Sequence, residues 1–205
     1  MTATVHSAKA SLRQQVRARL SAIPPAQREA ASLQTCSHLQ QQAIWKSAGS
    51  ILFFAPLPIE PDIWPLLEEA LAAGKAAALP RFSPVTKTYL AARIQNPDQD
   101  LHRGQLGIRE PTEACAEFPL SRLDLVLVPG VAFDLQGRRL GRGKGYYDRL
   151  LADVRGVKCG VGFDEQIVDA IPVGPLDVQL DCILTPTRWV EAKRSEDQNA
   201  KSKGW

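Results

Sequence analysis

A short stretch in the second half of the chain combines residue types that bind phosphate groups. Glycines and cations alternate there, as Arg139, Gly141, Arg142, Gly143, Lys144 and Gly145. Glycine lets backbone N–H groups approach a ligand, because it has no side chain and reaches positive φ at little cost. Arginine adds paired hydrogen bonds to phosphate oxygens, and lysine adds a mobile point charge. The stretch therefore predicts a polyphosphate-binding loop.

The loop differs from the two common phosphate-binding fingerprints. A P-loop would need glycine where Arg138 stands and serine or threonine where Gly145 stands. A dinucleotide-binding loop would need a third glycine in place of Tyr146. A flexible surface turn and a basic, glycine-rich RNA-binding segment are two other interpretations. An apolar run at residues 125–128 precedes the loop and a helical segment follows it, which favours a built anion site over both.

The segment at residues 141–148 reads Gly-Arg-Gly-Lys-Gly-Tyr-Tyr-Asp. With Val-Pro-Gly-Val-Ala-Phe-Asp at 128–134 before it, this segment resembles the signature of the 5-formyltetrahydrofolate cyclo-ligases, also called methenyltetrahydrofolate synthetases. Other segments match that family in order along the chain: Lys9-x-x-x-Arg13, Glu60-Pro-Asp62, residues 104–111, residues 162–166, Asp177, Asp181 and Thr185. The resemblance extends over about residues 7–190.

The resemblance implies an enzyme that uses ATP and Mg²⁺. Its substrate would be 5-formyltetrahydrofolate, with or without a polyglutamate tail, and its products 5,10-methenyltetrahydrofolate, ADP and phosphate. Lys144 and Arg142 would act on the transferred phosphoryl group as catalytic residues. The remaining residues implied to bind ATP are Lys9, Arg13, Arg139, Gly141, Gly143, Gly145, Tyr146 and Tyr147. The residues implied to bind the folate are Ala55, Glu60 and Tyr146.

Without the resemblance, some of these residues have plainer interpretations. Lys9 and Arg13 are four residues apart on a helix and share a face, which is usually a solvated surface. Glu60 could be a surface carboxylate before a helix, since the following proline suits a first helical turn. The resemblance implies instead that Glu60 binds the pterin ring of the folate, whose N–H donors suit an acceptor-only carboxylate.

The metal ligands implied by the resemblance are Asp148 and Asp181, with Asp177 as an alternative to the latter. Mg²⁺ takes one or two carboxylates and completes its shell with phosphate oxygens and water. Asp148 follows the glycine loop directly, where a carboxylate could otherwise merely favour the helix dipole. Asp181 precedes an apolar run, so a turn or cap role is the alternative there.

Two departures from the family pattern concern folate binding. Trp64 stands where many relatives have a basic residue, and the methionine expected near residues 88–90 is missing. One rival hypothesis is therefore a nucleotide-binding relative without folate turnover, an accessory or RNA-associated module, against which an intact Glu60 argues. The other rival is a different enzyme on a similar sheet, such as a sugar-phosphate isomerase or a CoA transferase, which would need no ATP.

The elements around the loop predict an α/β protein. Apolar runs of strand length occur at residues 50–55, 76–79, 88–94, 125–128, 157–162 and 182–185. Helices are expected from a cap at Ser7 to Pro24, from Pro25 to about Trp45, over 63–73 with Gly74 ending the helix, and over 144–154. Strands alternating with helices predict three layers, with a mostly parallel central sheet flanked by helices, as in Rossmann-like folds. In such sheets ligands bind beyond the carboxyl ends of the strands, where the loop after Val128 must lie.

Composition limits the partners. The chain is 44% hydrophobic and 23% charged, with a net charge of +3, which is too mild to indicate nucleic-acid binding. No run approaches the roughly 20 apolar residues of a membrane helix, and the first residues do not resemble a secretory signal. The four cysteines lack metal-binding spacing and suit reduced thiols. We expect a cytoplasmic protein that binds small molecules and no membrane.

The domain organisation is expected to be simple. Residues 1–190 should form one domain, active as a monomer, and the polar residues 191–205 should be disordered. Residues 96–120 are polar and rich in turns, and we expect them to form a long connection that crosses near the active site.

Overall fold

The computed structural model describes residues 2–104 and 107–192. Its helices are α1 (Thr2–Ser21), α2 (Pro25–Gln41), α3 (Ala43–Ser47), α4 (Trp64–Ala72), α5 (Pro97–Asp100) and α6 (Tyr146–Ala152), with 3₁₀ turns η2 (Leu120–Arg122) and η3 (Asp164–Gln166). Its strands are β1 (Ser50–Leu52), β2 (Ala76–Ser83), β3 (Thr88–Ile94), β4 (Leu101–Arg103), β5 (Arg109–Pro111), β6 (Glu117–Phe118), β7 (Leu125–Pro129), β8 (Ala132–Asp134), β9 (Arg139–Leu140), β10 (Val157–Val161), β11 (Ile167–Val168), β12 (Cys182–Leu184) and β13 (Trp189–Glu191).

The central sheet has eight strands in the order β13-β12-β10-β7-β1-β2-β3-β6. The five strands from β12 to β2 are parallel to one another, and β13, β3 and β6 are antiparallel to their neighbours. The predicted mostly parallel sheet is therefore confirmed. β7, which leads into the glycine loop, lies in its centre.

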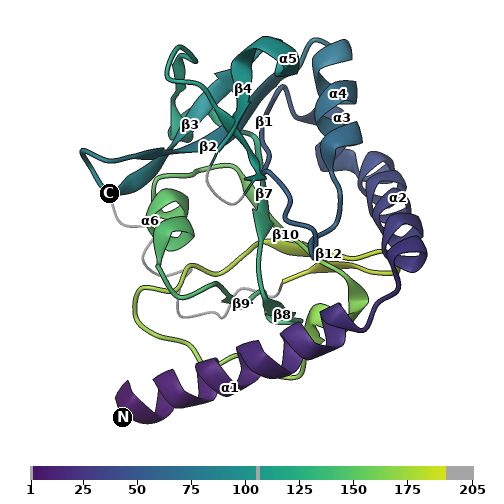
Figure 1. Cartoon of the computed structure of the whole chain (residues 1–205), viewed down its shortest axis with the longest axis vertical. Helices are drawn as coiled ribbons and strands as arrows, with labels where there is room; N and C mark the ends of the chain where they lie inside the picture. The colour runs from purple at the N-terminus through teal and green to yellow at the C-terminus, as the bar shows by residue number, and fades with distance from the viewer. Residues whose placement is uncertain (1, 105–106, 193–205) are drawn as a thin grey trace.

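Both faces of this sheet are buried, which explains why its strands read as continuous apolar runs. Alternate residues point to opposite faces. Leu125 and Leu127 join an apolar cluster with side chains of α2, α3 and α4, whereas Val126 and Val128 join a second cluster with α6. Figure 1 shows α2, α3 and α4 on one side of the sheet and α6 on the other. The molecule thus has the three predicted layers.

A third, smaller apolar cluster joins α1 to the segments around the glycine loop. It consists of Val16, Leu20, Ile23, Val131, Ala132, Leu140, Phe163 and Ile171. Figure 1 shows α1 running along the lower edge of the molecule, apart from the other helices. This cluster places the N-terminal helix next to β8 and β9.

Several helix boundaries differ from prediction. α1 begins at Thr2, not at a cap on Ser7, and the helix expected over 25–45 is divided at Gln42, whose backbone is extended (φ −74°, ψ 143°). The Gln42 side chain donates to the carbonyl of His38 at 3.0 Å, so it caps the end of α2. α6 is shorter than the predicted 144–154. Gly74 follows α4 with φ +74°, as expected for a residue that ends a helix.

Seven short strands were not predicted: β4, β5, β6, β8, β9, β11 and β13. β8 and β9 form a hairpin, and β11 pairs with β8, so that a small sheet of order β11-β8-β9 forms beside the central one. The connection at 96–120 is also more regular than expected, since β4 and β5 pair within it and β6 joins the central sheet. β13 includes Glu191, the first residue of the tail that was predicted to be disordered. From residue 193 on, that tail lies outside the described residues.

The four cysteines are all buried and unpaired by disulfides. Within the described part of the chain, no helix is long and apolar enough to cross a membrane.

Candidate active site

The glycine loop lies beyond the carboxyl end of β7 and enters α6. Gly143 and Gly145 have φ of +102° and +65°, in the region that L residues with a side chain rarely adopt. Gly145 is the residue immediately before α6. Arg142, Gly143 and Lys144 are exposed. The backbone of the loop therefore depends on its glycines, and its cations face solvent as a binding loop requires.

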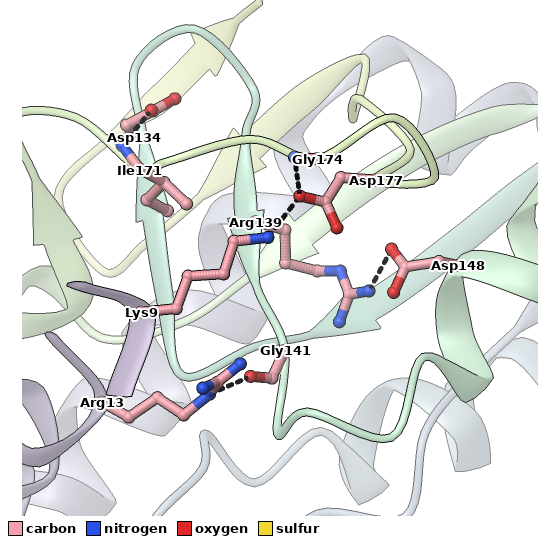
Figure 2. A network of polar contacts seen from close by, with 9 residues as sticks. All are labelled: Lys9, Arg13, Asp134, Arg139, Gly141, Asp148, Ile171, Gly174 and Asp177. Atoms are coloured by element: carbon pink, nitrogen blue, oxygen red, sulfur yellow. Dashed lines mark hydrogen bonds and ion pairs between the residues drawn. The ribbon is translucent and has the colours of Figure 1, made fainter. Parts of the chain in front are cut away.

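Helix α1 supplies the second group of cations. Arg13 Nε donates to the carbonyl oxygen of Gly141 at 2.8 Å, and Arg13 lies close enough to Gly143 that a Cβ there would be 3.6 Å from its Nη2. One turn earlier, Lys9 Nζ lies 2.5 Å from Asp177 Oδ2. Figure 2 shows both side chains reaching from α1 toward the loop. The two cations predicted to act with the loop are thus brought to it.

The electrostatic surroundings of Arg13 are mixed. Burial and the neighbouring Arg17 lower the pKa of Arg13, and Asp177 opposes the shift. Asp177 also accepts a hydrogen bond from the backbone N–H of Gly174 at 2.7 Å, which fixes the turn before it. Asp177 is therefore part of the cation cluster, although it is distant in sequence.

Arg139 differs from the other cations of the loop because it is buried. Its side chain is only 4% exposed, and its Nη2 donates to Asp148 Oδ1 at 2.8 Å. Its guanidinium lies over the Tyr147 ring at 5.7 Å, and a Cβ at Gly141 would come within 2.9 Å of its Nη1. Its Nε has no hydrogen-bond partner among the described residues. Arg139 therefore holds Asp148 and the loop backbone in place (Figure 2).

Lys144 and Arg142 are the exposed cations of the loop. Lys144 forms no hydrogen bond or ion pair with another described residue; its Nζ lies 5.9 Å from the centre of the Tyr146 ring. Arg142 Nη2 donates to Glu60 Oε1 at 2.7 Å. Lys144 is free to follow an anion, whereas Arg142 links the loop to another part of the site.

Aromatic side chains flank the loop on the side of β2 and β3. Tyr146 contacts Phe82 and Tyr89, each with ring centroids 5.4 Å apart, and Tyr147 lies 6.0 Å from Tyr89. Burial raises the pKa of the Tyr147 hydroxyl above its usual value, and the nearby Glu60 carboxylate raises it further. Tyr147 thus stays neutral at physiological pH, and both tyrosine rings offer flat apolar surface. Phe82 and Tyr89 were missed in the sequence, where nothing in their spacing marked them.

Glu60 connects the loop to a pocket of about 840 Å³. Only 7% of Glu60 is exposed, and its Oε2 accepts a hydrogen bond from the backbone N–H of Leu57 at 3.0 Å. The pocket is lined by Pro25, Arg28, Glu29, Ser32, Leu33, Pro56, Leu57, Pro58, Glu60, Asp62, Trp64, Pro65, Leu101, His102, Arg103, Gly107, Ile108 and Arg109. Its size is typical of a site for a small organic ligand. The predicted connection at 96–120 does cross here, because β4 and β5 form one wall.

Two further pocket residues, Trp64 and Arg109, bear on the departure at residue 64. Trp64 stacks against Arg109, whose guanidinium carbon lies 4.8 Å from the ring centre. A basic group is therefore present beside residue 64, although it comes from β5. Ala55 follows β1 at the carboxyl edge of the sheet and directly precedes Pro56, which lines the pocket.

The acidic residues considered as metal ligands fall into two places. Asp148, 21% exposed, lies beside the loop. Asp181 lies at the opposite edge of the sheet, at the amino end of β12, where its Oδ2 accepts a hydrogen bond from the N–H of Lys158 at 2.9 Å. The structure does not bring Asp181 to Asp148. No group of three or more His, Cys, Asp or Glu side chains that could hold a metal occurs in residues 2–104 and 107–192.

Fold and site together define an α/β protein with a phosphate-type loop at the carboxyl edge of its sheet and an adjoining pocket for an organic ligand. The sequence model of the 5-formyltetrahydrofolate cyclo-ligase family matches residues 5–186. The chain belongs to this family of enzymes.

Individual relatives agree with the assignment. The chain is 33% identical to the 5-formyltetrahydrofolate cyclo-ligase of Escherichia coli, with 84% of this chain and 97% of the relative covered, and 30% identical to that of Mus musculus, with 88% and 95% covered. The solved structure of Aquifex aeolicus 5,10-methenyltetrahydrofolate synthetase superposes with a TM-score of 0.81 at 32% identity, covering 92% of this chain and 94% of that one. The similarity extends over nearly the whole chain.

Proposed function

We propose that this protein converts 5-formyltetrahydrofolate and ATP into 5,10-methenyltetrahydrofolate, ADP and phosphate. The observation that carries the proposal is the contact between Arg142 and Glu60, which joins a cation-rich glycine loop to a pocket large enough for an organic ligand. A phosphate donor and a second substrate would then meet at one place. Membership of the cyclo-ligase family supplies the identity of the two ligands.

In this proposal the folate occupies the pocket beside Glu60. The carboxylate, buried and acceptor-only, suits the N–H donors of a pterin ring. Ala55 would contact the same ligand at the end of β1, and the exposed part of Tyr146 would contact both ligands. The Trp64 and Arg109 stack would form part of the pocket wall.

ATP would lie across the glycine loop and α1. Lys9, Arg13, Arg142 and Lys144 would contact its phosphates, while Gly141, Gly143 and Gly145 would let the backbone approach. Arg139 would act mainly by holding Asp148 and Tyr147, because its guanidinium is buried against them.

The residues present fit one Mg²⁺ ion bound chiefly through phosphate oxygens. Asp148, partly exposed and next to the loop, would supply a carboxylate, which agrees with the few protein ligands that Mg²⁺ needs. Position supports Asp177 over Asp181 as a second carboxylate, since Asp177 is bonded to Lys9 in the same cluster. When bound, the ion would neutralise phosphate charge.

The chemical work of the protein would be positioning and charge neutralisation, as is usual in phosphoryl transfer. The γ-phosphoryl group passes from ATP to the formyl oxygen on N5, which makes that oxygen a leaving group. N10 attacks the formyl carbon, the ring closes and phosphate departs. Lys144 and Arg142 would stabilise the group in transfer. We further propose that the enzyme is a monomer in the cytoplasm. Its four cysteines form no disulfide, and reduced thiols are typical of that compartment.

The test is the near-ultraviolet absorbance of purified protein mixed with 5-formyltetrahydrofolate, Mg²⁺ and ATP, beside a mixture without ATP. Ring closure conjugates N5, the bridging carbon and N10, so an ATP-dependent rise at longer wavelength is expected. If ATP binds but no rise occurs, the proposal fails and the protein is a nucleotide-binding module. A rise that is equal without ATP would instead indicate an enzyme of another class.

A further inference from the structure

One ion pair connects the two ligand sites. Arg142 Nη2 and Glu60 Oε1 are 2.7 Å apart, although the two residues are 82 positions apart in the chain. The Glu60 side chain is 6% exposed and the Arg142 side chain 44% exposed. The pair therefore has one fixed, buried partner in the pocket and one partner that can move into solvent.

Both partners have a second use. In the function proposed above, on which this inference rests, Glu60 receives the N–H donors of the folate and Arg142 receives phosphate oxygens of the nucleotide. Each Glu60 oxygen already accepts one hydrogen bond, from Leu57 or from Arg142, so a ligand with paired N–H donors competes with Arg142 for the carboxylate. A phosphate group likewise competes with Glu60 for the guanidinium of Arg142.

The structure around Arg142 permits such an exchange. Its neighbours in the chain are Gly141 and Gly143, and Gly143 already has a φ of +102°. Arg139, by contrast, is 4% exposed and bonded to Asp148, so it has no comparable freedom. Among the cations of the glycine loop, Arg142 is the one that contacts the pocket and is also exposed enough to turn away from it.

We propose that the ion pair between Glu60 and Arg142 couples folate binding to nucleotide binding. Whichever ligand arrives first must break the pair, and the second ligand then finds its partner residue released. Because the cost of breaking the pair is incurred once, each ligand tightens the binding of the other by the same factor. Partly exposed ion pairs are worth up to about fivefold in an equilibrium constant, so we expect coupling of roughly two- to fivefold.

The test is calorimetric titration of the full-length protein with a non-hydrolysable ATP analogue and Mg²⁺, in the absence and presence of 5-formyltetrahydrofolate. In the unaltered protein the folate should lower the Kd of the analogue by roughly two- to fivefold. In Glu60→Gln the pair is gone, and the analogue alone should bind as tightly as it binds the unaltered protein with folate. Glu113→Gln, which removes one exposed carboxylate elsewhere, should leave the coupling intact.

A second variant changes Arg142, the exposed partner of the pair, where a substitution should not affect folding. Arg142→Gln should bind 5-formyltetrahydrofolate alone as tightly as the unaltered protein does in the presence of the analogue. The inference is overturned if both ligands bind the unaltered protein independently, or if Glu60→Gln binds the analogue no more tightly than before. If the unaltered protein binds neither ligand, the proposed function itself fails, so the two failures are distinguishable.

Discussion

Among single residues, two cations of the same loop have opposite surroundings. Arg139 is buried, bonded to Asp148 and stacked on Tyr147. Lys144 is exposed, lies over the face of Tyr146 and forms no hydrogen bond or ion pair with another described residue. Burial and pairing fix Arg139 as part of the framework. Lys144 is therefore the residue whose loss should affect chemistry without affecting folding.

Lys144→Ala should abolish turnover and change the free energy of unfolding by less than about 0.5 kcal/mol, because an exposed side chain with few contacts is removed. Turnover is measured by the absorbance assay and stability by urea denaturation. Arg139→Met is the contrasting variant; it leaves Asp148 without its partner and should unfold at lower urea concentration. A fully active Lys144→Ala protein would exclude Lys144 from catalysis.

The roles of Asp148 and Asp181 can be distinguished by the Mg²⁺ concentration that nucleotide binding requires in a variant of each. Asp148→Asn should raise the Mg²⁺ concentration required for nucleotide binding by at least about tenfold, since a carboxylate beside the phosphates is lost. Asp181→Ala should leave that requirement unchanged but destabilise the fold by about 1 kcal/mol, because the N–H of Lys158 loses its acceptor. The Mg²⁺ requirement of both variants is measured by Mg²⁺ titration at a fixed concentration of nucleotide analogue, and the stability of Asp181→Ala by urea denaturation. An equal rise in the two variants would contradict the assignment.

The sequence identified the residues of the loop but not their partners. Ion pairs such as Glu60 with Arg142, or Lys9 with Asp177, join residues 82 and 168 positions apart, and no spacing rule reports such contacts. Arg109 beside Trp64 was missed for the same reason. Residue type predicts what a side chain can bind, whereas only the fold determines what lies next to it.

Among the elements, those with both faces buried were the easiest to predict. β1, β7, β10 and β12 are mostly apolar because each lies inside the sheet. β8, β9 and β11 have two or three residues each, too few to show a period. The break between α2 and α3 depends on a side-chain cap by Gln42, which the apolar pattern does not record.

The start of α6 depends on one glycine. Gly145 has φ +65°, and a Cβ there would meet nothing closer than Arg149 Nη1 at 3.6 Å, so strain and not crowding opposes substitution. Gly145→Ala should destabilise the protein by about 1 to 2 kcal/mol. Gly145→Asn should cost less, because asparagine tolerates this conformation better. Thermal unfolding measures both effects.

Gly174→Ala provides the matched control for this prediction. Gly174 is not among the glycines with positive φ, and a Cβ there would be 3.7 Å from Asp177 Oδ2. The same chemical change should therefore alter stability by less than about 0.5 kcal/mol. Equal losses for the two alanine variants would show that backbone conformation is not the cause.

For the whole molecule, buried acidic groups set the alkaline limit of stability. Burial, with Asp62 and Glu69 nearby, raises the pKa of the Cys36 thiol from 9.0 to about 11. A hydrogen bond with Cys182, together with burial, raises the pKa of Cys159 well above its usual value. Each neutral thiol is favoured by folding. The stability that Cys36 contributes is therefore complete below pH 9 and is lost as the pH rises toward 11.

We expect the free energy of unfolding to fall by about 2 kcal/mol for Cys36 alone between about pH 8 and about pH 10.5. Urea denaturation at the two pH values measures the loss. Cys36→Ser, whose hydroxyl does not ionise in this range, should show a smaller difference between them. An unchanged difference would mean that Cys36 does not titrate on unfolding.

The separate apolar cluster beneath α1 has a consequence for local motion. The helix that carries Lys9 and Arg13 is held by its own small cluster and not by those that line the central sheet, so it can detach briefly without opening the sheet. Amide hydrogens of α1 should then exchange with solvent faster than those of β1 and β7. A nucleotide bound by Lys9 and Arg13 would hold α1 in place and slow that exchange selectively. Because proteolysis also requires local opening, α1 would resist proteolysis when the site is occupied.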